Sequence, residues 1–321
     1  MTTATDDEAA LAGHLHRLAV LIAAGLAPRA AWAHVAAAAD DALLEMVAAR
    51  IQGGDDVGEA IDGAAASLAG DAGESAGSSE AGAAWRSLAA AWRVATTVGA
   101  PLAPALRGFA EGLRDREAAR RDIRIALAGP QATARIVMLL PAIAVLLGLL
   151  MGVDLVATVG TPVGAGAIVA GLVLVVIARR WMRRLVLAAA PPPPTVGLAL
   201  DLLAVAAGGG GSPEAAAALV TAEVGRAHPG TVDSSEPDTA GLDALGPLVR
   251  LSRAAGAPLG ELARAEAAEA RNRARAEARE GAERLAVRLM LPLGACILPA
   301  FLLLGVVPML IGLLSSTAGA W

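Results

Sequence analysis

The sequence predicts an all-α membrane protein with two homologous cytoplasmic helical-bundle modules and three transmembrane helices. Hydrophobic residues make up 56% of the 321 residues and charged residues 18%, which is too apolar for an ordinary soluble protein of this length. Long uncharged runs predict the transmembrane helices, and landmarks that occur twice in the same order predict the duplication. No stretch alternates in the manner of strands rich in valine, isoleucine, threonine and aromatic residues.

Three uncharged runs cover residues 136–153, 155–178 and 289–321. Each is long enough, or nearly so, for the roughly 20 residues that a transmembrane helix needs. The last run is shorter than the roughly 40 residues that two spans and a turn require, so we expect one span, kinked at Pro299 or Pro308. The predicted segments are a transmembrane hairpin at 135–178 with helices at about 136–153 and 157–178, a third helix at 288–314 and an extracytoplasmic tail at 315–321.

Arginine placement sets the expected orientation. The chain has no lysine, and its arginines flank the ends of the apolar runs that lead into charged segments. The positive-inside rule places those ends in the cytoplasm. We therefore expect a multi-pass protein of the inner (cytoplasmic) membrane with a cytoplasmic N-terminus, an extracytoplasmic C-terminus and Asp154 in the outer loop. The membrane-interface basic residues are Arg135, Arg179, Arg180, Arg183, Arg184, Arg284 and Arg288.

Repeated glycine and proline landmarks indicate an internal duplication. Gly-Ala-Pro-Leu begins at Gly99 and again at Gly256, each time after an apolar segment and before an Arg/Glu-rich one. A glycine ends one helix and a following proline begins the next, so these positions predict helix turns. The predicted turn residues are Gly25, Pro28, Gly99, Pro101, Gly210, Pro213, Gly256 and Pro258.

The landmarks define two modules. We expect module 1 at residues 1–134, module 2 at 197–287, and a basic, proline-rich linker at 179–196. Module 1 has extra residues between its landmarks, and the acidic stretch at about 62–84, rich in glycine, alanine and serine, predicts a flexible insert. The expected helices lie near residues 9–25, 28–52, 84–98, 101–127, 197–208, 213–227, 242–255 and 258–287.

The sequence predicts no catalytic, cofactor-binding or metal-binding residues. The run Gly208–Gly211 resembles a phosphate loop, but the absence of lysine excludes a P-loop. His14, His16 and His34 lack carboxylate or cysteine partners at ligand spacing, and no nucleophile with a base stands out. Cys296 falls in the third apolar run, where packing is its ordinary role. We therefore do not expect an enzyme.

The stretch from Glu261 to Arg288 mixes glutamate and arginine. Pairs such as Glu269 with Arg273 and Glu280 with Arg284 are four residues apart, which stabilises an exposed helix by roughly 0.2 to 0.5 kcal/mol each. The charges either stabilise only this helix or present a charged face to a partner protein or to anionic lipid headgroups.

Four motifs follow one another in the first half of the chain: "AAGLAPRAAW" from Ala23, "IQGGDDVGEAI" from Ile51, "TTVGAPLAPAL" from Thr96 and "ALAGPQATARIVMLLP" from Ala126. Their order resembles the bacterial type II secretion system F-type family, and especially its tight-adherence (Tad/Flp) pilus branch. The second half resembles the family too. That family commonly has an acidic residue after the glycine of the turn, where this chain has Ala100 and Ala257, so no partner-contact residue is carried over.

The resemblance implies an inner-membrane platform protein of a type II secretion or tight-adherence type IV pilus machine. It would couple a cytoplasmic assembly ATPase to pilin or pseudopilin assembly within the lipid bilayer, as a homo- or hetero-oligomer, with no nucleic acid and no cofactor. The alternative function is an oligomeric small-solute transporter subunit, which the scarcity of polar residues in the apolar runs weakens.

Overall fold

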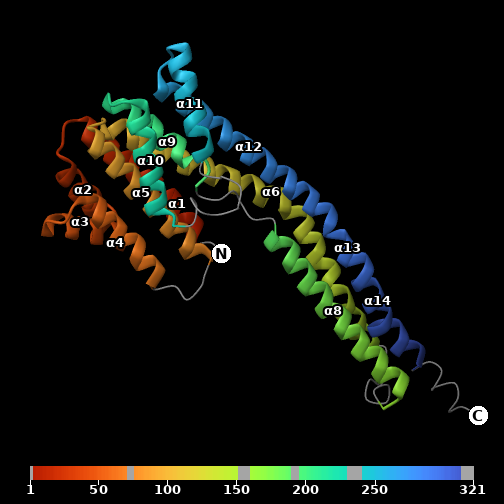
Figure 1. Ribbon diagram of the computed structural model, residues 1–321. Coiled ribbons are helices and arrows are strands. Elements are labelled where there is room, and N and C mark those ends of the chain that lie inside the picture. The colour runs from red at the N-terminus through yellow and green to blue at the C-terminus, as the bar shows by residue number, and fades with distance from the viewer. Residues whose placement is uncertain (1–2, 71–75, 151–159, 189–194, 230–240, 312–321) are drawn as a thin grey trace, which may run out of the picture. The chain divides into compact units, whose positions relative to one another are not determined.

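The computed structural model describes residues 3–70, 76–150, 160–188, 195–229 and 241–311. All regular secondary structure in these ranges is helical (Figure 1), which confirms the all-α class. The first half holds α1 (Thr3–Ala23), α2 (Pro28–Ala37), α3 (Ala42–Gly53), α4 (Val57–Gly70), α5 (Ala76–Val98) and α6 (Leu102–Leu150). Asp154, the tetraproline at 191–194 and the tail at 315–321 lie outside the described residues.

The second half continues with further α-helices and with short 3-10 and π-helical segments. These are α8 (Pro162–Ala188), α9 (Leu198–Ala206), η1 (Ala207–Gly209), α10 (Pro213–Ala227), α11 (Leu242–Ala255) and α12 (Leu259–Arg288). The chain then passes through α13 (Met290–Pro292), η2 (Leu293–Ile297), α14 (Leu298–Phe301) and η3 (Leu302–Val306).

The chain divides into two compact units. The first contains Met1–Ala119 and Pro192–Ala276, and the second contains Arg120–Pro191 and Glu277–Trp321. Helices α6 and α12 each contribute residues to both units. Most helices expected for modules 1 and 2 therefore fall in the first unit, while those expected at 101–127 and 258–287 continue into the second, which also contains the three apolar segments.

Helix α5 is the centre of the first unit. From Ala81 to Ala95, every residue is buried except Arg86 and Arg93, which are half-buried, as expected for a helix surrounded on all sides. One face packs into a core with α1 to α4, where the rings of Trp32 and Trp92 lie 6.1 Å apart. The opposite face joins the core formed by α9 to α12. Helix α5 thus contributes buried residues to both cores of this unit.

Two local expectations differ from the structure. The helix expected at 28–52 is broken between Ala37 and Ala42, because Asp41 caps α3 by accepting hydrogen bonds from the backbone N–H groups of Leu43 and Leu44 at 2.9 and 3.4 Å. The expected flexible insert at about 62–84 is helical over the parts that α4 and α5 cover. Apolar side chains explain this, since Ile61, Ala64 and Ala65 are buried on one face of α4.

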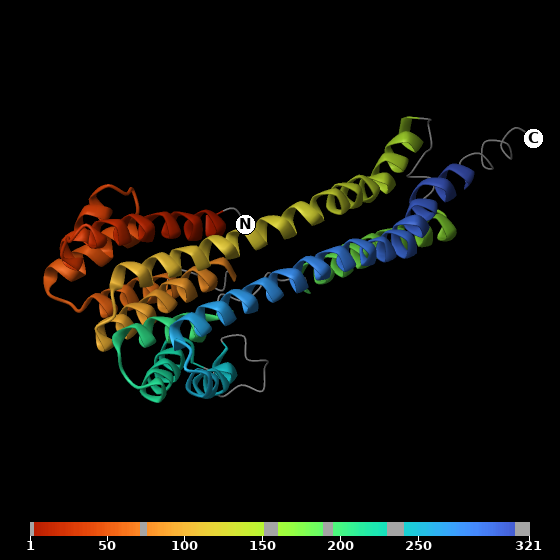
Figure 2. The ribbon, with the colours of Figure 1, turned by 90° about the horizontal axis from the view of Figure 1, so that it is seen from above.

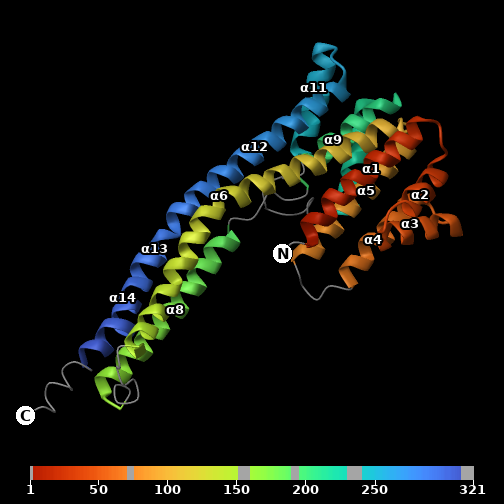
Figure 3. The same cartoon turned by 180° about the vertical axis from the view of Figure 1, so that it is seen from behind.

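The second unit is a set of long apolar helices. Within the described residues, three helices are long and apolar enough to cross a membrane: Leu102–Leu150, Pro162–Leu185 and Leu259–Ile311. Figures 2 and 3 show α8 beside the helical segments that follow α12. The π-helical segments η2 and η3 precede Pro299 and Pro308, the two positions at which a kink is expected. A proline lacks the N–H that an α-helix needs, and a wider turn accommodates it.

Candidate functional site

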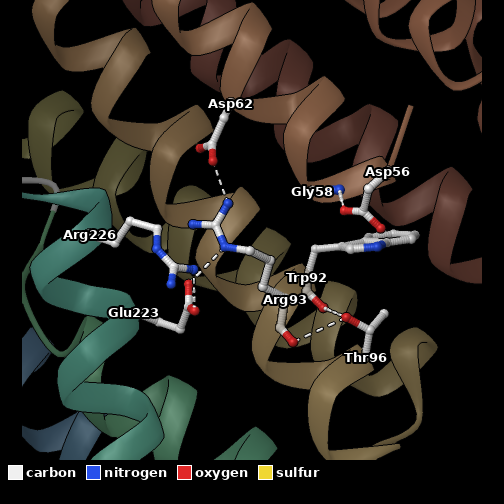
Figure 4. A network of polar contacts seen from close by, with 8 residues as sticks. All are labelled: Asp56, Gly58, Asp62, Trp92, Arg93, Thr96, Glu223 and Arg226. Carbon is white, nitrogen blue, oxygen red and sulfur yellow. Dashed lines mark hydrogen bonds and ion pairs between the residues drawn. The ribbon is translucent and has the colours of Figure 1, made fainter. Parts of the chain in front are cut away.

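Arg93 of α5 lies at the centre of a polar network inside the first unit (Figure 4). Its Nε donates to Oε2 of Glu223 on α10 at 2.7 Å, and its Nη1 donates to Oδ2 of Asp62 on α4. Arg226 donates from Nη1 to Oε1 of the same Glu223 at 2.5 Å. The network therefore ties α4 and α5 from the first half of the chain to α10 from the second.

Burial makes this network energetically important. Only 16% of the Arg93 side chain and 7% of the Glu223 side chain are exposed. Although burial by itself would lower the pKa of Arg93, the hydrogen bond that it donates to Glu223 and the charge of Asp62 raise it above its ordinary value. Breaking a buried pair by removing one partner typically costs about 3 to 5 kcal/mol. The arrangement fixes how three helices pack and offers no group for chemistry.

Ser87, also on α5, contacts the residue that ends α10. Oγ of Ser87 lies 2.8 Å from the carbonyl oxygen of Ala83 and 2.9 Å from Nε2 of His228. A carbonyl oxygen only accepts, so the single hydroxyl hydrogen goes to Ala83, and Nε2–H of His228 donates to Ser87. Burial, together with the positive charges of Arg86 and Arg116, lowers the pKa of His228 to about 4. This histidine is neutral at physiological pH.

A third polar contact joins α12, α9 and α6 in the same unit. Nη1 of Arg271 donates to Oδ2 of Asp201 at 2.6 Å, and its Nε lies 3.6 Å from Oδ2 of Asp115. Burial raises the pKa of Asp201, while the charge of Arg271 opposes that rise. Arg271 thus links the charged helix α12 to the core helices, as Arg93 links α5 to α10.

A cavity of about 280 Å³ lies beside this contact. Its lining is mostly apolar and includes Pro101, Phe109 and Leu202, with Asp201 and Arg264 as charged members. Arg264 is already paired with Glu261. The described lining therefore contains no nucleophile with a base and no set of metal ligands.

The three histidines that the sequence analysis considered as metal ligands, His14, His16 and His34, do not gather into a metal site within the described ranges. No group of three or more His, Cys, Asp or Glu side chains gathers there in a way that could hold a metal ion. Instead, His14 lies 3.8 Å from Asp41, and burial lowers its pKa. His16 and His34 are exposed, and Cys296 is buried.

The turn glycines adopt the backbone conformation that favours glycine. The φ angles of Gly25, Gly99, Gly210 and Gly256 are 94°, 69°, 76° and 65°, in the left-handed region. Each glycine is followed three residues later by the first residue of a helix, which is Pro28, Leu102, Pro213 or Leu259 respectively. Pro101 and Pro258 directly precede α6 and α12, and Ser212 caps α10 by accepting from the N–H of Ala215 at 3.1 Å.

The arginines expected at the membrane interface all lie in the second unit and are exposed. Arg284 donates to Oε1 of Glu280 at 2.5 Å. The others have no carboxylate partner among the described residues: Arg135, Arg179, Arg180, Arg183, Arg184 and Arg288.

Sequence reasoning missed the Arg93 network, although a signal for part of it was available. Arg86 and Arg93 lie in a helical segment whose other residues are apolar or small. They are seven residues apart, so they share one face of the helix. Two charges within a buried helix require partners. The sequence could not show which residues these partners are, because Glu223 lies 130 residues from Arg93 and the two meet only in the folded unit.

Comparison with known proteins finds a family match within the first half of the chain. Residues 14–150 match the family model of the type II secretion system (T2SS) protein F. The searches among curated proteins and among solved structures gave no match. The matched segment runs from within α1 to the end of α6 and includes Asp62 and Arg93. Together with the three long apolar helices, the match points to a protein of the inner membrane.

Proposed function

We propose that this chain is an inner-membrane platform protein of a type II secretion or tight-adherence type IV pilus machine. It would couple a cytoplasmic assembly ATPase to the assembly of pilin or pseudopilin subunits. The observation that carries this proposal is the family match at residues 14–150, which covers most of the first helical core and continues into the first apolar helix. The three apolar helices support a membrane location.

In this proposal the chain transmits force and does not catalyse a reaction. The polar contacts of the first unit support such a role, because Arg93 and Arg271 join helices from distant parts of the sequence by partly buried ion pairs. A unit held by such contacts can move as one body when a partner pushes on it. The tight-adherence branch and the ATPase partner come from the sequence resemblance.

We also infer that residues 1–134 and 197–287 are related copies. The supporting observation is that each pair of landmarks has the same local geometry. A left-handed glycine lies three residues before a helix start at Gly25 and Gly210, and again at Gly99 and Gly256. Superposition in an experimental structure tests this, and the inference fails if Gly99 and Gly256 do not occupy equivalent turns.

The test of function is a gene deletion in the host cell. We expect loss of surface filaments or of a secreted protein, restored by the full chain, and co-purification of a secretion-type ATPase with the tagged chain. The purified chain alone should not hydrolyse ATP. Normal filaments and secretion in the deletion strain would reject the platform role, and ATP hydrolysis by the chain alone would reject the non-enzymatic proposal.

A further inference from the structure

On each of the three long helices of the second unit, one arginine marks the transition to an uncharged run with exposed apolar side chains. On α6, Arg135 is followed by Ile136, which is 66% exposed. On α8, the order is reversed, and the exposed Ile177 precedes Arg179. After α12, the exposed Met290 and Leu291 follow Arg288.

Buried contacts place these three transitions at the same level of the unit. Ala134 of α6, Met182 of α8 and Leu289, which follows α12, belong to one buried cluster. A neighbouring cluster joins Ala178 of α8 to Ile297, with Val137 of α6 packed against it. The arginines beside these residues therefore lie in one layer, directly next to the exposed apolar surface.

The residues of this layer form what we call the arginine collar. It comprises Arg135, Arg179, Arg180, Arg183, Arg184 and Arg288. All are exposed, and none has a carboxylate partner among the described residues. The two acidic residues of α12 that are nearest to Arg288 in sequence are already paired with other arginines, Glu280 with Arg284 and Glu283 with Arg279. The collar is a surface of uncompensated positive charge.

The arrangement of α8 shows where its four collar arginines point. Ala178 and Met182 are buried, and Leu185 packs beside them, so these residues mark the inward face of the helix. The arginines at 179, 180, 183 and 184 occupy the remaining faces. Trp181, 40% exposed, lies among them, and tryptophan is typical of the membrane–water boundary.

We propose that the arginine collar binds the phosphate groups of anionic phospholipids. This inference rests on the proposal that the three apolar helices cross a membrane. A phospholipid phosphate lies where the apolar part of a bilayer ends, which is the place that the collar occupies on this unit. Guanidinium groups bind phosphate oxygens through paired hydrogen bonds, and anionic lipids supply a charge that zwitterionic lipids do not. A soluble acidic protein would explain the arginines but not their alignment with the apolar boundary.

The test compares phosphatidylglycerol with phosphatidylcholine on the full-length chain purified in a neutral detergent. Native mass spectrometry gives the apparent Kd of each lipid, and purification removes any effect of the variants on insertion. The test variant carries Arg179→Gln, Arg180→Gln, Arg183→Gln and Arg184→Gln. A matched variant carries Arg17→Gln, Arg114→Gln, Arg250→Gln and Arg273→Gln, which removes the same charge from exposed positions of the first unit.

We expect tighter binding of phosphatidylglycerol than of phosphatidylcholine. Each arginine near the surface of an anionic membrane contributes up to roughly fivefold in affinity, so the test variant should lose at least about tenfold for phosphatidylglycerol. The matched variant should change by less than about twofold. The four corresponding Arg→Lys changes should lose less affinity than the Gln changes, because the charge stays while the paired hydrogen bonds of the guanidinium are lost. Equal binding of the two lipids, or equal loss in both Gln variants, would overturn the proposal.

Two further measurements distinguish a lipid site from a site for soluble phosphate, and failure of the collar proposal from failure of the proposed membrane insertion. Glycerol 3-phosphate at the same phosphate concentration should not compete with the lipid, and full competition would show a site for soluble phosphate instead of a lipid surface. Flotation of proteoliposomes after an alkaline wash tests insertion itself. A chain that leaves the bilayer rejects the proposed function, whereas a chain that stays but shows no lipid preference rejects only the collar proposal.

Discussion

Nε2 of His228 donates to Oγ of Ser87 at 2.9 Å, although the two residues lie 141 positions apart in the chain. The contact joins the end of α10 to the buried helix α5. It depends on a neutral imidazole, because Arg86 and Arg116 stand near the ring and burial disfavours its charged form. Acid should therefore weaken this part of the first unit.

The first prediction is that stability falls as pH decreases from about 6.5 to about 4. The unfolded chain protonates His228 near its ordinary pKa of about 6.5, whereas the folded unit does so only near a pKa of about 4. Between these values the proton binds the unfolded state, which lowers the free energy of unfolding by roughly 3 kcal/mol in total. Urea unfolding followed by tryptophan fluorescence across this pH range measures the loss.

The His228→Gln variant is the control for this pH effect. Glutamine keeps a hydrogen-bond donor but does not titrate, so a large part of the pH dependence should disappear. The pKa of His14 is lowered by burial as well, so some acid sensitivity remains. An unchanged slope in the variant would contradict the assignment to His228.

The second prediction concerns Arg93. Arg93→Met removes the partner that Glu223 and Asp62 share, and we expect a loss of about 3 kcal/mol in the free energy of unfolding. Arg226→Met removes the other partner of Glu223, but 59% of the Arg226 side chain is exposed, so the loss should stay below about 1 kcal/mol. Equal losses in the two variants, measured by urea unfolding, would show that burial of Arg93 does not matter.

Local features of this fold were predictable from sequence, and long-range ones were not. Gly99 and Gly256 could be placed at helix turns because glycine favours a left-handed backbone wherever a helix stops. The pairing of Arg93 with Glu223 could not be predicted, since it depends on how α5 packs against α10. The break before α3 had a local signal in Asp41, a good helix cap, which the apolar pattern of residues 28–52 obscured.

A third prediction tests the close approach of η1 to α5. A Cβ built on Gly209 would lie 2.6 Å from Cβ and 2.7 Å from Cγ2 of Val98, which is closer than packed atoms allow. We expect Gly209→Ala to lower the free energy of unfolding by about 1 to 3 kcal/mol. Gly208→Ala is the matched control, because its nearest neighbour is Cβ of Ala100 at 3.9 Å. Similar stability of the two variants in urea would argue against this contact.

A fourth prediction tests packing between the apolar helices. A Cβ on Gly305 of η3 would lie 2.7 Å from Cβ of Ala144 on α6, and small residues allow membrane helices to approach closely. Gly305→Val should therefore lower the thermal unfolding midpoint of the full chain in detergent. Gly294→Val provides the comparison, since Gly294 also lies in a π-helical segment but has no atom within 4 Å of a built Cβ. Equal midpoints for the two variants would contradict this packing.

The last prediction is the orientation of the chain in the membrane. The arginines follow the second apolar helix and precede the first and third, and the positive-inside rule assigns those ends to the cytoplasm. Reporter fusions after residues 60, 158, 240 and 321 should therefore read inside, outside, inside and outside. An alkaline phosphatase reporter, active outside, and a fluorescent protein reporter, active inside, give opposite signals at each position. A cytoplasmic signal after residue 321 would contradict an odd number of spans. An outside signal after residue 240 would place residues 192–276 of the first unit outside the cytoplasm, where a cytoplasmic ATPase could not reach them.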